Sequence, residues 1–139
     1  MLRALFRRLL GDQRGVSAIE FAILAPVLFT LLLGTIEFGR MFYIRQGMEN
    51  ATEQALRFYM LNPASAQSTV TQTLQSAMVG GMGSQLSVAY ADTANCNSRS
   101  ASTLKCTTIT VTYPFHFVAG FLGLADRTLT ARGQTVRWQ

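Results

Sequence analysis

The first half of the chain carries one long apolar run. No charged side chain occurs in residues 21–36. The run that begins near Val16 is long enough to cross the hydrocarbon core of a bilayer, which takes about 20 helical residues. The pattern therefore predicts a membrane-spanning helix over residues 16–39.

Beyond Arg40 the apolar residues recur every three or four positions, which is typical of an amphipathic helix. They are Met41, Ile44, Met48, Ala51, Ala55 and Phe58. The first strong helix breaker is the pair Asn62 and Pro63. We therefore expect residues 40–62 to extend the membrane helix, giving a continuous helix about 70 Å long at 1.5 Å per residue.

Residues 63–139 have the composition of a small α+β head. Residues 64–79 predict a second, shorter helix, and the glycine cluster that follows predicts a turn. Three segments then alternate apolar and polar residues, as half-buried strands do. They are residues 85–90, 107–113 and 128–138. Three antiparallel strands against the amphipathic half of the long helix complete the expected fold.

A phenylalanine-rich segment separates the second and third predicted strands. Phe115, Phe117, Phe121 and Leu122 either complete the core or form an exposed apolar patch that binds something.

The charge of the chain is concentrated before the apolar run. Of the net charge of +5, residues 1–15 contribute +3 through four arginines and one aspartate. Only two arginines lie within about 20 residues after the run, so the positive-inside rule places the N-terminus in the cytoplasm and exports the head. The soluble part has no basic cluster or nucleic-acid-binding motif, which argues against a nucleic-acid partner.

Glu20 places a carboxylate near the start of the apolar run, where a charge in lipid costs roughly 2.5–3.5 kcal/mol on insertion scales. A cut between Gly15 and Val16 would create a free α-amine, and Glu20 would become the fifth residue of the mature chain. The two opposite charges pair best between neighbouring, staggered helices. Removal of an ordinary secretory signal and an uncut anchor are the alternatives.

The segment from Arg14 to Tyr59 resembles the TadE-like pseudopilins of tight-adherence pili. The likeness rests on the basic leader, Gly15 before the cut, Glu20 followed by Phe21, the apolar run with Pro26, the pair Glu37 and Arg40, and a continuation rich in Ala, Gln and Asn.

This resemblance implies a pilin-like α+β subunit whose residues 1–15 form a cytoplasmic leader removed by a prepilin peptidase. It further implies a minor pilin or pseudopilin of the bacterial inner membrane, acting in pilus assembly, priming or capping, and hence in adhesion. The implied partners are the membrane, other pilins and pseudopilins of the same pilus, and the inner-membrane assembly platform. The competing interpretations are an uncleaved, single-span assembly factor and a tethered exported binding module.

Small residues four positions apart follow the membrane segment. They are Ala18, Ala22, Pro26, Thr30 and Gly34. Such a stripe lets helices approach closely in lipid, although small residues are also common in membrane helices generally. Pro26 removes a backbone donor, so it either kinks the helix or is accommodated within it.

Glu37 and Arg40 lie at the outer end of the span, with a spacing that allows an intrahelical ion pair. They are either interfacial anchors that reach the aqueous side or a contact with another pilin-like subunit.

Cys96 and Cys106 flank a polar, loop-like segment. A disulfide between them would close a short ring worth about 3 kcal/mol in the chain-entropy model, and an exported head favours it over two free thiols.

Enzymatic groups are sparse. His116 is the only histidine, and the acidic residues of the head are Asp92 and Asp126, with no nucleophile motif beside them. We therefore expect no catalysis, no cofactor and no metal site.

Overall fold

The computed structural model of the protein describes residues 15–94, 104–118, 120, 123 and 125–138. The leader residues 1–14 lie outside this part, as do Cys96, Phe121 and Leu122. The elements in chain order are α2 (Val16–Leu61), α3 (Gln67–Ala77), the 3-10 segment η2 (Val79–Gln85), β1 (Ser87–Ala94), β2 (Leu104–Phe115) and β3 (Arg127–Trp138).

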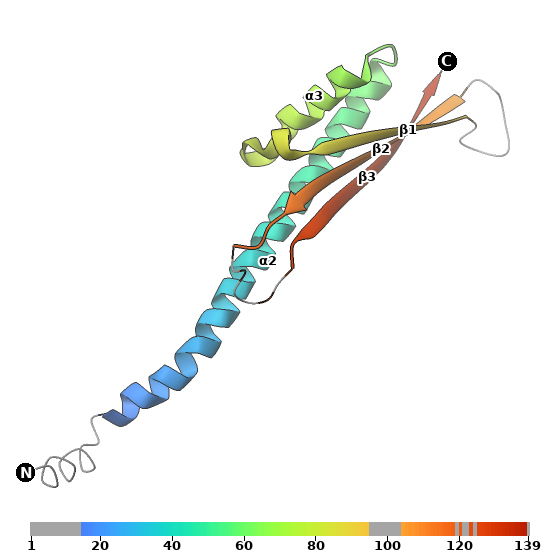
Figure 1. Ribbon diagram of the computed structural model, residues 1–139. Coiled ribbons are helices and arrows are strands. Elements are labelled where there is room, and N and C mark those ends of the chain that lie inside the picture. Colours follow the sequence, from blue (N-terminus) through green and yellow to red (C-terminus); the bar gives the residue numbers. More distant parts are fainter. Residues whose placement is uncertain (1–14, 95–103, 119, 121–122, 124, 139) are drawn as a thin grey trace, which may run out of the picture.

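The long helix predicted from Val16 is confirmed. α2 has 46 residues and is about 69 Å long at 1.5 Å per residue. Its N-terminal half projects away from the rest of the protein, and its C-terminal half lies under the sheet (Figure 1). Pro26 does not interrupt it, and Thr30 Oγ1 donates a hydrogen bond of 2.7 Å to the Pro26 carbonyl.

α3 is shorter at both ends than the predicted residues 64–79. At its start, the Ser65 N–H donates to the Asn62 carbonyl over 3.0 Å, so the chain makes a turn before the helix begins. At its end, α3 stops at Ala77 because Met78 is extended, with a ψ of 130°. Within η2, Gly80 and Gly81 then adopt positive φ angles of 67° and 69°, a left-handed conformation that glycine accepts and a right-handed helix excludes. The predicted glycine turn is therefore correct.

The three predicted strands form one antiparallel sheet in the order β1-β2-β3. β2 is central, with Val88 opposite Val111 and Val111 opposite Ala131. Each strand extends beyond its predicted segment at one or both ends, because cross-strand hydrogen bonds continue beyond the residues that alternate most clearly. The first strand begins at Ser87 and not at the predicted residue 85, which is the last residue of η2. The order of the strands in the sheet is therefore their order in the sequence.

The core lies between the sheet and the two helices, which share one face of it (Figure 1). β2 contributes Ile109, Val111 and Phe115, each 0% exposed, and α2 contributes Met48 and Ala55, also 0% exposed. Burial of these side chains is the main stabilising contribution to the head. The amphipathic half of α2 therefore belongs to the head, as its spacing predicted.

Two glycines allow neighbouring elements to pack closely. A Cβ atom at Gly83 would clash with the backbone of Gln75, lying 2.7 Å from its carbonyl carbon, so η2 can fold back on α3 only without a side chain there. A Cβ at Gly133 of β3 would meet Leu56 and lie 3.1 Å from Thr52 Cγ2 on α2.

A tyrosine ties β1 to α3. The Tyr90 hydroxyl lies 2.8 Å from Thr71 Oγ1 and donates to the Gln67 carbonyl over 3.0 Å. Burial raises the pKa of Tyr90 above its ordinary value, with a further contribution from Tyr59, while the hydrogen bond with Thr71 opposes the shift.

Candidate functional site

The predicted processing boundary coincides with the start of α2. The helix begins at Val16, and Gly15 precedes it as an N-cap without a side-chain hydrogen bond. Glu20 lies one turn inside the helix and is exposed, as are Val16 and Phe21. A cut after Gly15 would leave the new amine on the first residue of the helix, one turn from the carboxylate. The cleavage itself stays a prediction.

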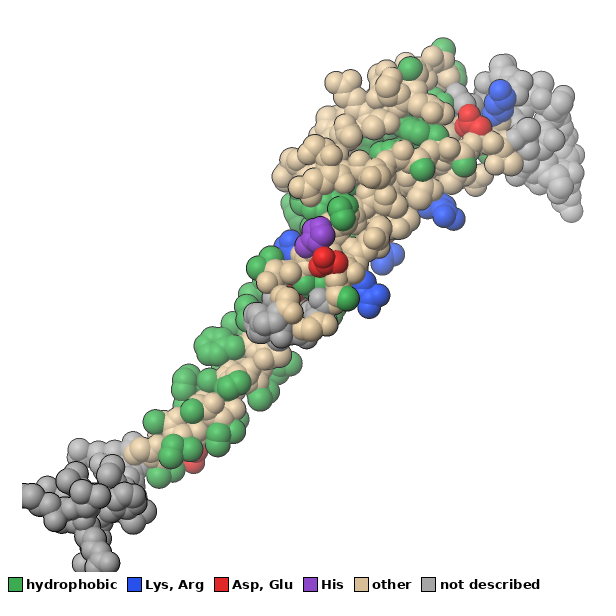
Figure 2. All heavy atoms as spheres, in the orientation of Figure 1, with side chains coloured by type: hydrophobic (Ala, Val, Ile, Leu, Met, Phe, Trp, Pro, Cys, Tyr) green, Lys and Arg blue, Asp and Glu red, His purple; other side chains and the backbone are tan. Residues whose placement is uncertain are grey.

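The N-terminal half of α2 exposes its apolar side chains on all sides. α2 contains a segment long and apolar enough to cross a membrane, and none of that segment is buried within the protein. Figure 2 shows hydrophobic side chains along this half up to its junction with the head. A surface of this kind requires lipid or neighbouring helices around it.

The stripe of small residues lies within this exposed half. Its members are exposed except for Gly34, which is half-buried, and no heavy atom lies within 4 Å of a Cβ built at Gly34. The stripe is therefore open to a neighbouring helix, and its role in helix packing stays a prediction.

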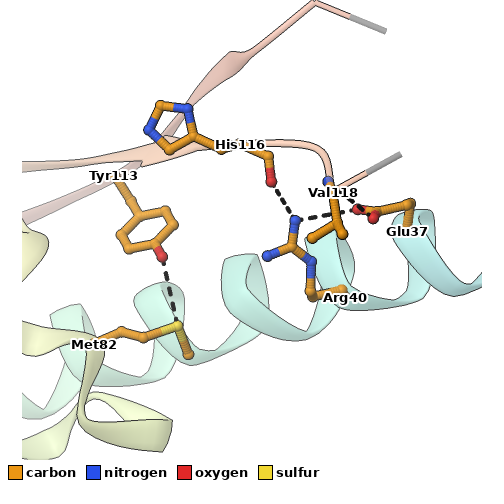
Figure 3. A network of polar contacts seen from close by, with 6 residues as sticks. All are labelled: Glu37, Arg40, Met82, Tyr113, His116 and Val118. Atoms are coloured by element: carbon orange, nitrogen blue, oxygen red, sulfur yellow. Dashed lines mark hydrogen bonds and ion pairs between the residues drawn. The ribbon is translucent and has the colours of Figure 1, made fainter. Parts of the chain in front are cut away.

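Glu37 and Arg40 are brought together and also bind the connection between β2 and β3 (Figure 3). Arg40 Nη2 donates to Glu37 Oε2 over 3.1 Å and also to the carbonyl of His116. Glu37 Oε1 accepts a hydrogen bond of 3.0 Å from the Val118 N–H. We call these four residues the Glu37 bracket. It attaches the β2–β3 connection to α2 at the outer end of the apolar run.

The bracket compensates for the burial of its carboxylate. The Glu37 side chain is 7% exposed and that of Arg40 is 38% exposed. Removal of a carboxylate from water is costly unless its oxygens are paired and hydrogen-bonded, and here both oxygens have partners within the chain. The spacing predicted the ion pair, whereas the partners on the β2–β3 connection carried no signal in the sequence.

Arg40 also packs on the aromatic core. Its guanidinium carbon lies 4.3 Å from the centroid of the Phe115 ring, a cation–π arrangement. Phe117 meets Phe115 edge to face, with centroids 5.0 Å apart and an interplanar angle of 82°. Phe115 is fully buried and Phe117 packs against the core, so these two phenylalanines follow the core interpretation of the segment.

A histidine–aspartate pair lies on the same connection. His116 Nδ1 is 2.7 Å from Asp126 Oδ2, and the two side chains are 70% and 62% exposed. Sequence reasoning missed this contact, because the two residues are ten positions apart and belong to opposite sides of the connection. The pair stays in solvent, and no group of three or more metal-ligating side chains occurs among the described residues.

Cavities flank α2 on the side of the head, and two of them are lined by described residues. One, of about 400 Å³, lies between α2 and β3 and includes the exposed ion pair of Arg45 and Glu49, whose atoms are 3.1 Å apart. The other, of about 360 Å³, lies beside the bracket. It is lined by Phe38, Met41, Phe117, Ala125, Arg127, Thr128 and Leu129. The second cavity is mostly apolar, with one cation in its lining.

Cys106 is buried and disulfide-bonded. Cys96, the other member of the predicted pair, lies outside the described residues. The pairing of Cys96 with Cys106 therefore stays a prediction.

A comparison with known protein families finds a match for the N-terminal part of the chain. Residues 15–57 match the family model described as TadE-like protein. The match begins at Gly15 and extends through most of α2, including Glu20 and the Glu37–Arg40 pair. No curated protein and no solved structure matches the chain significantly. The match supports involvement in tight-adherence pilus systems and, together with the apolar helix, is consistent with a membrane-anchored protein. Residues 15–57 are thus similar to the TadE-like family, which is the family that the sequence suggested.

Proposed function

We propose that the chain is a minor pilin or pseudopilin of a tight-adherence pilus, processed by a prepilin peptidase and acting in pilus assembly, priming or capping. The observation that carries this proposal is the coincidence of two boundaries. The TadE-like match starts at Gly15, and α2 starts at Val16. The domain and the apolar helix thus share the boundary that processing would create.

The proposed mechanism starts from the charge of Glu20. Cleavage gives the first residue of α2 a positive amine, and the helix N-terminus itself favours a nearby carboxylate. In neighbouring subunits staggered along their helices, the amine of one meets Glu20 of the next. The pairing lowers the cost of holding Glu20 in an apolar surrounding, so assembly in the membrane favours processed chains.

The proposed location follows from the charges. The arginine-rich leader stays in the cytoplasm, α2 crosses the inner membrane, and the head lies on the far side. The partners are then the prepilin peptidase, the other pilins and pseudopilins of the same pilus, and the assembly platform. We propose that the head is an exported interaction module without catalytic activity.

The first test is the identity of the N-terminus. The full chain is expressed with and without a prepilin peptidase. A Gly15→Leu variant is expressed in parallel, because a peptidase site that accepts only a small residue before the cut would not bind leucine there. We expect a mature chain that begins at Val16 only with the peptidase and only with Gly15 intact. A persisting Met1 terminus in cells that make functional pili would contradict the proposal.

The second test concerns assembly. Glu20→Ala is compared with Glu53→Ala, which removes an exposed acidic residue from the other half of the same helix. We expect Glu20→Ala to be cleaved normally but to co-purify less with pilin subunits, and Glu53→Ala to behave as wild type. Equal co-purification of both variants would remove the proposed role of Glu20.

A further inference from the structure

We propose that the base of the head rests in the headgroup region of the bilayer and is covered by phospholipid. The surface concerned consists of Phe38, Phe42 and Tyr43 on α2 and Val118 on the β2–β3 connection, and we call it the head base. The proposal rests on the membrane anchoring of α2, and it requires neither cleavage nor entry into a pilus.

The head base exposes large apolar side chains above the predicted end of the span. Phe42 is 61% exposed, Tyr43 59% and Val118 81%. Exposed apolar side chains therefore continue beyond Glu37, on α2 and on the β2–β3 connection. Figure 2 shows the hydrophobic side chains of the projecting helix reaching this junction. Large apolar side chains exposed close to a membrane span are more stable in contact with lipid or protein than with water.

The length of the helix places this surface at the right depth. A hydrocarbon core of about 30 Å accommodates about 20 helical residues, so a span that starts at Val16 leaves it near Ile36. Phe38 then lies about 3 Å and Phe42 about 9 Å beyond the core, within or next to the headgroup layer. Helical side chains lean toward the helix N-terminus, which here is toward the lipid.

The Glu37 bracket fixes the second half of the surface. The Val118 N–H is bound to Glu37, so the exposed Val118 side chain is held beside the point where α2 leaves the hydrocarbon core. The carboxylate at this level is neutralised by Arg40 and is almost fully covered. The bracket therefore exposes the apolar Val118 side chain toward the membrane while the Glu37 carboxylate stays paired and covered.

The neighbouring cavity fits the same occupant. Its lining contains Phe38, Met41 and Phe117, and its volume of about 360 Å³ is mostly bounded by apolar groups. Arg127 also lines it and forms no ion pair with any described residue. An acyl segment next to a phosphate group would match this combination of an apolar lining and the Arg127 guanidinium. Continuity with the span and this complementarity favour lipid over a protein partner.

The test uses depth-dependent quenching of tryptophan fluorescence in the full chain. The native Trp138 is replaced by Phe, and single tryptophans are introduced as Tyr43→Trp or Val118→Trp. Met60→Trp is the matched control, because Met60 is 57% exposed on α2 at the far end of the head. Phe29→Trp reports on the span itself. The proteins are reconstituted in phosphatidylcholine vesicles with bromine atoms at shallow or deep acyl positions.

We expect shallow bromines to quench Tyr43→Trp and Val118→Trp at least twofold more than Met60→Trp, with emission shifted to shorter wavelength. Quenching of both no greater than that of Met60→Trp overturns the proposal. Short-wavelength emission without quenching also overturns it, because protein rather than lipid then covers the surface. If Phe29→Trp is unquenched too, membrane anchoring itself fails, whereas quenching of Phe29→Trp alone overturns only the seating of the head.

Discussion

The Glu37 bracket makes a local and measurable contribution to the attachment of the head. Glu37→Gln keeps the shape of the side chain and an oxygen for the Val118 N–H, but it removes the charge that pairs with Arg40. A hydrogen bond to a charged group contributes about 1.5–3 kcal/mol. Because the Arg40 side chain is 38% exposed and solvent screens part of the interaction, we expect a loss of about 1–2 kcal/mol.

The amide hydrogen of Val118 reports this loss directly, because it is the donor to Glu37. Since 1.4 kcal/mol corresponds to a tenfold change, hydrogen exchange at Val118 should accelerate about 5- to 30-fold in Glu37→Gln, measured in detergent micelles. Exchange near the C-terminus of α2 should not change.

Glu49→Gln is the matched control. This substitution removes a carboxylate from the ion pair between Arg45 and Glu49 on the same helix. Both side chains of that pair are well exposed, and such pairs contribute about 0–1 kcal/mol. Equal exchange at Val118 in wild type and Glu37→Gln would refute the assigned role of the bracket. An equal effect of Glu49→Gln would show a nonspecific response to lost charge.

Three further predictions concern the head. Gly83→Ala should lower the free energy of unfolding by about 1–3 kcal/mol, because its methyl group meets the backbone of Gln75, whereas Gly120→Ala, with open space around it, should have little effect in chemical denaturation. Phe115→Ala should cost about 3–5 kcal/mol in the same assay, and a cost near zero would contradict its place in the core. The raised pKa of Tyr90 gives stability that is complete below about pH 10 and is lost as the pH rises through the folded-state pKa. Tyr90→Phe should therefore lose less stability than wild type between about pH 9 and about pH 11, and parallel curves would refute the assignment.

Local periodicity was sufficient to predict the elements of the fold. The spacing of Ile44, Met48, Ala51 and Ala55 identified the buried face of α2, since a helix returns to the same side every three to four residues. The alternation around Ile109 and Val111 did the same for β2.

Contacts between distant parts of the chain could not be predicted in this way. Val118 is 81 residues from Glu37, and nothing in its surrounding sequence marks its N–H as a donor to a carboxylate. His116 and Asp126 are close only because the β2–β3 connection folds back on itself. For the pair Glu37 and Arg40, the sequence supplied the helical spacing but not the reason for burial, which is the packing of another segment over it.

The uninterrupted course of α2 couples the orientation of the head to that of the span. Glu20 and Glu37 are 17 residues apart, about 4.7 turns, so their side chains point in directions that differ by about 100° around the axis. Insertion of one residue between them would rotate the head by about 100° and raise it by about 1.5 Å. The number of residues in the span thus sets the azimuth at which each head faces its neighbours, as well as its height.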